Sequence, residues 1–219
     1  MNCVNKTRST QPRRRRRVAV FVSGGGTNLQ TLLDAQSEGL LQSGEIALVI
    51  SSKVGVYALE RAKNAGVPAF AVPRKELTLE AFEAKCLALL EEYRIDYIVL
   101  AGFLTIFSGD FIRRFPNRII NVHPALLPAF GGKGFYGLRV HGAALERGVK
   151  ITGATVHFVT EICDGGPILM QKAVEVLPGD TPESLQKRVM EQAEWVLLPQ
   201  ALEMVCAGEM EITPPDSTP

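Results

Sequence analysis

The sequence predicts an α/β domain with a single doubly wound, mostly parallel sheet and helices on both of its faces. Short runs of β-branched and apolar residues alternate with longer helical patterns along most of the chain. These runs are continuous rather than alternating, as in strands that are buried on both faces of a parallel sheet. At 219 residues, 46% apolar and 21% charged, the chain has the size and balance of one large domain.

The expected strands and helices follow one another in the β-α-β-α order that gives right-handed crossovers. The strands are residues 18–22, 46–50, 69–72, 97–101 and 119–122. The helices between them are residues 28–35, 56–65, 79–93 and 109–115. Gly66 followed by Pro68 marks the end of the second helix, because glycine adopts the C-terminal cap conformation and proline cannot continue a helix.

The pattern changes after His123. A stretch rich in proline and glycine, residues 123–137, predicts a long loop, and loops of this length are usually functional or mobile. A short helix, two β-rich segments and a closing amphipathic helix should follow, over residues 140–147, 152–159, 167–176 and 182–207. Thr181 is the expected N-cap of the last helix, with Pro182 at its first position.

Basic side chains gather at the N-terminus. The first 17 residues hold seven of the 24 basic side chains and no acidic one, so the rest carries 17 basic against 23 acidic residues. The arginine run 13–17 suggests a nucleic-acid or membrane contact, or simply a solvated tail. We expect the solvated tail: a basic, disordered segment over 1–16, a domain over 17–210 and a frayed end over 211–219. The tail lacks the apolar stretch of a signal peptide, whereas an organelle transit peptide remains open.

The cysteines are scattered and form no Cys-x-x-Cys pair, at positions Cys3, Cys86, Cys163 and Cys206. This spacing argues against a zinc site or a disulfide framework and fits a reducing compartment. Three histidines also leave little material for a metal centre. We therefore expect a cytoplasmic protein without a metal, acting on small molecules as a monomer or homodimer and requiring no nucleic acid or membrane.

A glycine-rich segment, residues 23–28, follows the first strand and opens the first helix. Glycines let the backbone approach an anion closely, and exposed N–H groups with the helix dipole then hold a phosphate. The alternative is a plain tight turn with Thr27 capping the helix. The segment matches neither the Walker A pattern nor Gly-x-Gly-x-x-Gly, so ATP and NAD are disfavoured as ligands.

Asn121 and His123 come at the end of the fifth predicted strand. Side chains two positions apart point to the same face of an extended chain, and Pro124 favours that extended backbone. An amide donor beside an imidazole suits acyl transfer, because the amide can steady an oxyanion while the imidazole moves protons. No serine, cysteine or lysine nucleophile stands beside them, which favours direct attack by the substrate. A capping asparagine and a structural histidine remain the alternative.

Asp164, followed by Gly165 and Gly166, lies in a later loop. A carboxylate near His123 would raise the pKa of the imidazole and favour its protonated form. The sequence does not bring the two residues together, and Asp-Gly-Gly is also a common turn.

Together these motifs resemble the phosphoribosylglycinamide formyltransferase family, the folate-dependent transformylases of glycinamide ribonucleotide, from about residue 17 to residue 210. The matching stretches are residues 23–28, 100–104, 121–128, 155–159 and 164–167. The Asn-x-His-Pro segment with Leu-Leu-Pro is specific to folate formyltransferases, and the glycine-rich opening narrows the resemblance to the glycinamide ribonucleotide branch.

The resemblance implies transfer of a formyl group from 10-formyltetrahydrofolate to the amine of glycinamide ribonucleotide, a step of purine biosynthesis. His123 would act as the general acid, Asn121 would steady the oxyanion, and Asp164 would raise the pKa of His123. The nucleotide would bind to Gly26, Thr27, Asn28 and Glu194. The folate would bind to Leu104, Thr105, Ile106, Phe107, Asn121, Glu161, Ile162 and Cys163.

Three positions depart from the family pattern or stay open. Counting back from Pro199 selects Glu194 as the nucleotide contact, whereas counting forward from Val189 selects Ala193, because the chain is one residue longer there. The loop 129–136 is longer than in the shortest members. Leu79 falls where some members place an arginine that reaches the folate tail.

The two remaining histidines and the alternative functions also give expectations that the structure can address. His141 and His157 are expected to be structural or to support the reacting residues. The nearest rival is another folate-dependent formyltransferase, or a formyltetrahydrofolate hydrolase. A formyltransferase that acts on charged initiator tRNA would carry a further C-terminal domain, and the hydrolase an extra N-terminal one. A nucleotide-sensing domain that kept the fold is the rival from another class.

Overall fold

The computed structural model describes residues 14–209, which form a seven-stranded sheet in the order β3-β2-β1-β4-β5-β6-β7. The strands are β1 (Arg16–Val22), β2 (Gly44–Ser51), β3 (Ala69–Ala71), β4 (Tyr97–Leu100), β5 (Ile119–His123), β6 (Ile151–Phe158) and β7 (Ile168–Glu175). The first five strands are parallel to one another, whereas β6 runs antiparallel to β5 and β7 antiparallel to β6. This confirms the doubly wound, mostly parallel sheet.

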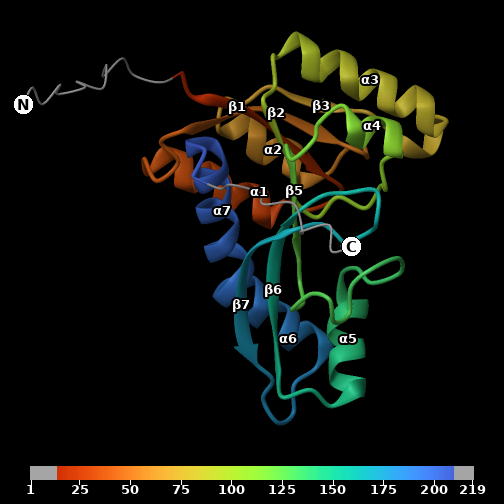
Figure 1. The fold of residues 1–219 in the computed structure, drawn as a ribbon, viewed down its shortest axis with the longest axis vertical. Helices are drawn as coiled ribbons and strands as arrows, with labels where there is room; N and C mark the ends of the chain where they lie inside the picture. The colour runs from red at the N-terminus through yellow and green to blue at the C-terminus, as the bar shows by residue number, and fades with distance from the viewer. Residues whose placement is uncertain (1–13, 210–219) are drawn as a thin grey trace, which may run out of the picture.

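The helices cover both faces of the sheet, as expected (Figure 1). They are α1 (Thr27–Ser37), α2 (Tyr57–Asn64), α3 (Leu79–Glu92), α4 (Gly109–Arg113), α5 (Leu138–Arg147), α6 (Pro182–Val189) and α7 (Trp195–Ala207). A 3-10 turn, η1 (Arg74–Glu76), precedes α3. The helices α1, α2, α6 and α7 pack on one face of the sheet, and α3 and α4 pack on the other.

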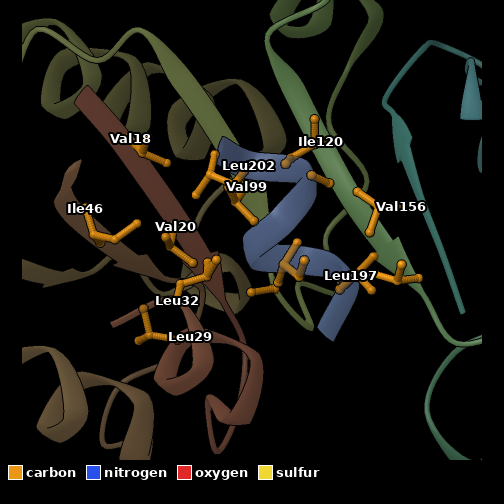
Figure 2. Packing of buried hydrophobic residues seen from close by; sticks show 14 of the residues in the cluster. Val18, Val20, Leu29, Leu32, Ile46, Val99, Ile120, Val156, Leu197 and Leu202 are labelled. Carbon is orange, nitrogen blue, oxygen red and sulfur yellow. The ribbon is translucent and has the colours of Figure 1, made fainter. Parts of the chain in front are cut away.

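The larger core lies between the strands and helices α1 and α7 (Figure 2). Val20 and Val99 project from neighbouring parallel strands onto this face, and Leu32 and Leu202 meet them from the two helices. All four side chains are fully buried, and each buried aliphatic side chain contributes roughly 1.5–3 kcal/mol to folding. The buried sheet thus holds the carboxyl ends of β1, β4 and β5 in fixed register.

The predicted boundary of the N-terminal tail is wrong for its last residues. Arg16 opens β1, and the guanidinium of Arg15 donates to the carbonyl oxygens of Leu41 at 2.8 Å and Gly44 at 2.9 Å. Arg14 pairs with Asp96 at 2.8 Å. These arginines are part of the fold because they satisfy carbonyl and carboxylate groups at the start of the strands. The remainder of the predicted tail, and the whole of the predicted frayed end, lie outside the described residues.

The closing helix is interrupted rather than continuous. Thr181 caps α6 through a bond from the Ser184 N–H, as predicted, and Pro182 takes the first helical position. A π-helical turn, η2 (Met190–Glu194), then joins α6 to α7. A π turn has i→i+5 hydrogen bonds, so it accommodates one residue more than an α turn.

Within residues 14–209, no helix is long and apolar enough to cross a membrane. The same residues contain no group of three or more histidine, cysteine or carboxylate side chains arranged to hold a metal ion.

Candidate active site

A cleft of about 640 Å³ opens at the carboxyl ends of β1, β4 and β5. Ligands bind at this edge in open α/β sheets, because the loops that follow the strands converge there. Ten of the predicted site residues line it: Gly26, Thr27, Asn28, Leu104, Ile106, Asn121, His123, Cys163, Asp164 and Glu194. Residues separated by most of the chain therefore meet around one space that can hold a small molecule.

One end of the cleft is formed by the glycine-rich segment and the N-terminus of α1. Gly26 adopts the left-handed backbone conformation with φ of 73° and precedes the first helical residue, Thr27. Ser23 is buried beneath the segment, where its hydroxyl hydrogen-bonds to Ser52 and accepts from the N–H of Leu104. These bonds tie the loops after β1, β2 and β4 together. The open N-terminus of the helix faces the space where an anion would be stabilised.

The other end contains Asn121, His123 and Asp164. The antiparallel register of β5 and β6 pairs Asn121 with His157. As a result, Asn121 Nδ2 lies 3.1 Å from His157 Nε2. Asp164 stands between the two imidazoles, with Oδ2 3.6 Å from His123 Nδ1 and Oδ1 3.5 Å from His157 Nε2. The carboxylate that the sequence left unplaced is therefore beside His123.

Backbone groups hold the two histidines and the carboxylate in place. His123 Nε2 lies 2.8 Å from the carbonyl oxygen of Phe130, and His157 Nδ1 lies 2.8 Å from that of Phe158. Because a carbonyl oxygen only accepts, those two ring nitrogens carry protons. Asp164 Oδ2 accepts from the N–H of Gly132 at 2.8 Å. The loop after β5 thus fastens both His123 and Asp164.

Two residues of this end have unusual backbones. Phe130 and Asp164 adopt φ values of 52° and 55°. This left-handed region favours glycine, tolerates asparagine and aspartate, and disfavours a bulky residue such as phenylalanine. Such conformations cost on the order of 1 kcal/mol or more and cluster at functional sites. Both flank His123, one through its carbonyl oxygen and the other through its carboxylate.

Burial and charge act in opposite directions on the reacting residues. Burial lowers the pKa of His123, and this outweighs the upward effects of the Asp164 carboxylate and the Phe130 carbonyl. The expected upward effect of Asp164 is present, but the net shift is downward. Burial alone would raise the pKa of Asp164, yet bonds from His157 and Gly132, with the nearby His123, lower it overall. Asp164 is therefore a carboxylate at neutral pH.

The π turn decides which residue of the closing helix enters the cleft. Glu194 lines the cleft, whereas Ala193 is fully buried in the core. Glu194 is 6% exposed, and its Oε2 accepts from Asn28 Nδ2 at 2.7 Å. Burial raises the pKa of Glu194 to about 6, against the opposing effect of that hydrogen bond. The count from Pro199 therefore selects the residue that lines the cleft, and its contact with the nucleotide stays a prediction.

Some of the residues predicted to contact the folate line the cleft, and others do not. Leu104 and Ile106 line the cleft and are 54% and 57% exposed. Phe107 instead stacks on Phe111 in the core, with ring centroids 3.9 Å apart. The side chain of Glu161 pairs with Arg113, and that of Ile162 is exposed outside the cleft lining. Thr105 does not line the cleft either.

His157 was expected to be structural or to support the reacting residues, and it contacts both Asn121 and Asp164 without lining the cleft itself. Sequence reasoning missed several residues that do line the cleft. Gln186 and Met190 line the cleft from α6 and η2, and Lys133 and Tyr136 line it from the loop after β5. The helical spacing of 186, 190 and 194 was the signal that could have found the first two.

The sheet brings an open helix N-terminus and an Asn-His-Asp group to one cleft, an arrangement that suits binding of an anionic substrate and acyl transfer. The profile of the formyl transferase family matches residues 16–202, which is most of the chain. The chain therefore belongs to the formyl transferase family.

The relatives agree with this assignment. The chain is 41% identical over 186 residues to the chloroplastic phosphoribosylglycinamide formyltransferase of Arabidopsis thaliana, covering 84% of this chain and 63% of that protein. It is 41% identical to the human trifunctional purine biosynthetic protein adenosine-3, covering 91% of this chain and 19% of that protein. The chain thus spans less than two thirds of these curated relatives.

Solved structures match over nearly their full length. Glycinamide ribonucleotide transformylase 1 from Symbiobacterium toebii superposes with a TM-score of 0.85 at 42% identity, covering 91% of this chain and 92% of that one. The phosphoribosylglycinamide formyltransferase of Brucella melitensis gives a TM-score of 0.81 at 42% identity, covering 91% of this chain and all of that one.

Proposed function

We propose that this chain transfers the formyl group of 10-formyltetrahydrofolate to the amine of glycinamide ribonucleotide. One arrangement carries the proposal: Asn121, His123 and Asp164 meet in the same cleft as an open helix N-terminus that suits a phosphate. The names of the relatives, which are glycinamide ribonucleotide transformylases, support the same substrates.

The glycine-rich end suits the nucleotide. Backbone N–H groups at Gly26, Thr27 and Asn28 hold the phosphate, assisted by the dipole of α1. Glu194 and the unpaired Oδ1 of Asn28 are buried acceptors at this end, so they take hydroxyl or amine donors of the ribonucleotide. A buried acceptor without a partner costs about 1–3 kcal/mol, which substrate binding relieves.

The folate binds beyond the reacting residues. Leu104 and Ile106 expose apolar side chains within the cleft, which suits the flat ring system of a folate. Backbone groups of residues 104–107 and 161–163 supply the polar contacts to the pterin, so the outward side chains of Glu161 and Ile162 are compatible with that role. With Leu79 in place of an arginine, this chain does not supply that cation to the folate tail.

The reaction proceeds by direct attack of the substrate amine on the formyl carbon. A new C–N bond forms, the bond from the formyl carbon to N10 of the folate breaks, and one proton passes from the amine to N10. Asn121 donates a hydrogen bond to the oxyanion of the tetrahedral intermediate, and His123 delivers the proton to N10 as general acid. Asp164 stabilises the imidazolium form of His123. Nε2 of His123 must exchange the Phe130 carbonyl for a substrate atom to do so.

An assay with glycinamide ribonucleotide and 10-formyltetrahydrofolate tests the proposal. Wild-type chain should transfer the formyl group, and Asn121→Ala, His123→Ala and Asp164→Ala should each lower kcat by on the order of 10²-fold or more. Asp110→Asn, which changes an exposed carboxylate, is the matched control. Absence of transfer by the wild type would refute the proposed function, and release of formate instead would indicate a hydrolase.

The remaining expectations stay predictions. They are a cytoplasmic location, a monomer or homodimer, the absence of a metal from the reaction, and the absence of a required nucleic acid or membrane. Sedimentation of the purified chain and activity in the presence of a chelator test the second and third of them.

A further inference from the structure

We propose that Arg61, on α2, is a positioning residue for the anion-binding loop. It holds the carbonyl group of Gly25 away from the cleft, and thereby points the N–H of Gly26 into the cleft. The identity of the bound anion as the phosphate of glycinamide ribonucleotide rests on the proposed function. The orientation of the loop does not.

Three successive carbonyl groups of the loop are held by hydrogen bonds on the side away from the cleft. The Gly24 oxygen accepts from the N–H of Ala58 at 3.3 Å, and the Gly25 oxygen accepts from Arg61 Nε at 2.8 Å. The Gly26 oxygen accepts from the N–H of Gln30 at 2.9 Å, the first bond of α1. Two of the three donors belong to α2, so α2 fixes the orientation of the loop.

Because the peptide bond is planar, the contacts of the carbonyl groups also fix the directions of the N–H groups. In a trans peptide the C=O and the following N–H point in opposite directions, and the peptides of this loop are trans. The N–H groups of Gly25, Gly26 and Thr27 therefore point away from their bonded carbonyl groups. Among residues 14–209 none of these three groups donates a hydrogen bond, and all three residues line the cleft.

The loop cannot move closer to α2, but one of its peptides has space to rotate. A Cβ on Gly26 would lie 2.6 Å from Cβ of Ala58, so the backbone already touches the helix. Gly25 is different, because a Cβ there would have no atom within 4 Å. The Gly25–Gly26 peptide thus has space to rotate, and the bond from Arg61 is the contact that sets its direction.

Arg61 is itself fixed on three sides. One terminal nitrogen donates to Oε1 of Gln30 at 2.8 Å, and the guanidinium lies 4.8 Å from the ring centroid of Tyr57. In the described part of the chain it forms no ion pair with a carboxylate. Its charge therefore remains uncompensated directly behind the loop, where it favours an anion on the other side.

Loss of the guanidinium would free the Gly25 carbonyl. The peptide could then rotate and present a partly negative oxygen to the anion in place of an N–H donor. The effect falls on the binding of phosphate, and the proton transfer at His123 should be unchanged because that residue lies at the other end of the cleft.

Binding of inorganic phosphate to the full chain tests the inference without requiring catalysis. In wild type, the amide resonances of Gly25 and Gly26 should shift as phosphate is added. Arg61→Met, which keeps an unbranched side chain but has no donor, should weaken phosphate binding by about tenfold. Arg61→Lys keeps a charge and a donor, so it should lose less. Lys63→Ala removes an exposed charge from the same helix and should bind as wild type does.

The kinetic experiment separates positioning from a general structural role. Arg61→Met should raise KM for glycinamide ribonucleotide by about tenfold, with kcat and KM for the folate within about twofold. Unchanged phosphate affinity in Arg61→Met would overturn the inference. An equal rise in KM for both substrates together with a lowered Tm would also overturn it. So would amide resonances of Gly25 and Gly26 that do not shift when phosphate is added to the wild type. An inactive wild type that still binds phosphate in this manner would refute only the proposed function.

Discussion

The two ends of the cleft are built from different parts of the chain and from different chemical groups. Beside α1, the groups that face the ligand are backbone N–H groups of consecutive residues, oriented by contacts to α2. Beside β5, they are the side chains of Asn121 and His123 on one strand and of Asp164 on a distant loop. The first end depends on local backbone conformation, and the second depends on the register of β5 with β6 and on two long-range loop contacts.

This difference determines which property each end controls. Backbone N–H groups carry no titratable proton, so the glycine-rich end can bind an anion but cannot move a proton. The side-chain end holds an imidazole and a carboxylate whose pKa values are both displaced from their ordinary values. Substitutions at the first end should therefore act on nucleotide affinity, and substitutions at the second on turnover.

The largest expected effect follows from Asp164→Asn. The substitution keeps the shape and tolerates the left-handed backbone, but it removes the carboxylate that stabilises charged His123. We expect kcat to fall on the order of 10²- to 10⁴-fold with KM for the nucleotide nearly unchanged. Because Asp164 raises the pKa of His123, the limb of the kcat–pH profile that reports His123 should also move to lower pH.

A profile that stays in place with a normal kcat would remove Asp164 from the mechanism. His157→Asn is a second test of the side-chain end of the cleft. It removes the contacts to Asn121 and Asp164 while leaving His123 intact. Its effect on kcat should be smaller than that of Asp164→Asn.

The next effect contrasts two glycines of the glycine-rich loop at the other end of the cleft. Gly26→Ala must accommodate a φ of 73° and a Cβ 2.6 Å from that of Ala58, so the loop has to shift. Gly24→Ala meets no atom within 4 Å and serves as the matched control. We expect Gly26→Ala to raise KM for the nucleotide by roughly 10- to 100-fold, whereas Gly24→Ala should change it by less than about threefold.

Equal KM values for the two alanine variants would contradict the backbone-based account of this end. A fall in kcat with unchanged KM would contradict it as well, since it would make the two ends functionally alike.

Glu194 lies at the nucleotide end yet carries a titratable group. The pH dependence of the free energy of unfolding therefore tests its protonation state. Burial raises the pKa of Glu194 from 4.5 to about 6 in the folded state. The contribution of this carboxyl group to the free energy of unfolding is therefore full below pH 4.5, where it is protonated, and is lost as the pH rises through about 6. Glu194→Gln should therefore raise the free energy of unfolding at pH 8 by about 2 kcal/mol and leave it nearly unchanged at pH 4. Thermal unfolding at both pH values measures this, and a destabilised variant at pH 8 would refute the assigned burial.

The two ends also differed in how far the sequence could predict them. The glycine-rich segment after β1 is contiguous, so its position at the helix N-terminus followed from local pattern alone. Asn121 and His123 followed from strand periodicity. Asp164 entered only through the family resemblance, because no local pattern sets the fold of the loop that contains it. The hydrogen bond that fixes it comes from Gly132, which lies 32 positions away in the sequence, and His157 Nε2 lies 3.5 Å from its carboxylate.

Three features of the site that the sequence left undetermined have the same physical origin. His157 entered the site through the antiparallel register of β5 and β6, which the sequence does not specify. Glu194 was ambiguous because a π turn is not visible in helical periodicity. Phe107 was assigned to the folate by position; its side chain packs against Phe111 in the core, so only its backbone groups are left for that contact. Apolar side chains on neighbouring positions of a loop give no signal for which of them turns inward.

The smallest expected effect concerns the N-terminal arginines, which lie outside both ends of the cleft. No residue before Gly25 lines the cleft among residues 14–209, so deleting residues 1–13 should leave kcat/KM within about twofold. Extending the deletion through Arg16 removes the bonds from Arg15 to the Leu41 and Gly44 carbonyls and the first residue of β1. That longer deletion should lower Tm by several degrees, corresponding to about 1–3 kcal/mol, with KM for both substrates unchanged in the folded fraction. A loss of activity in the shorter deletion would show that the cleft depends on residues beyond its two ends.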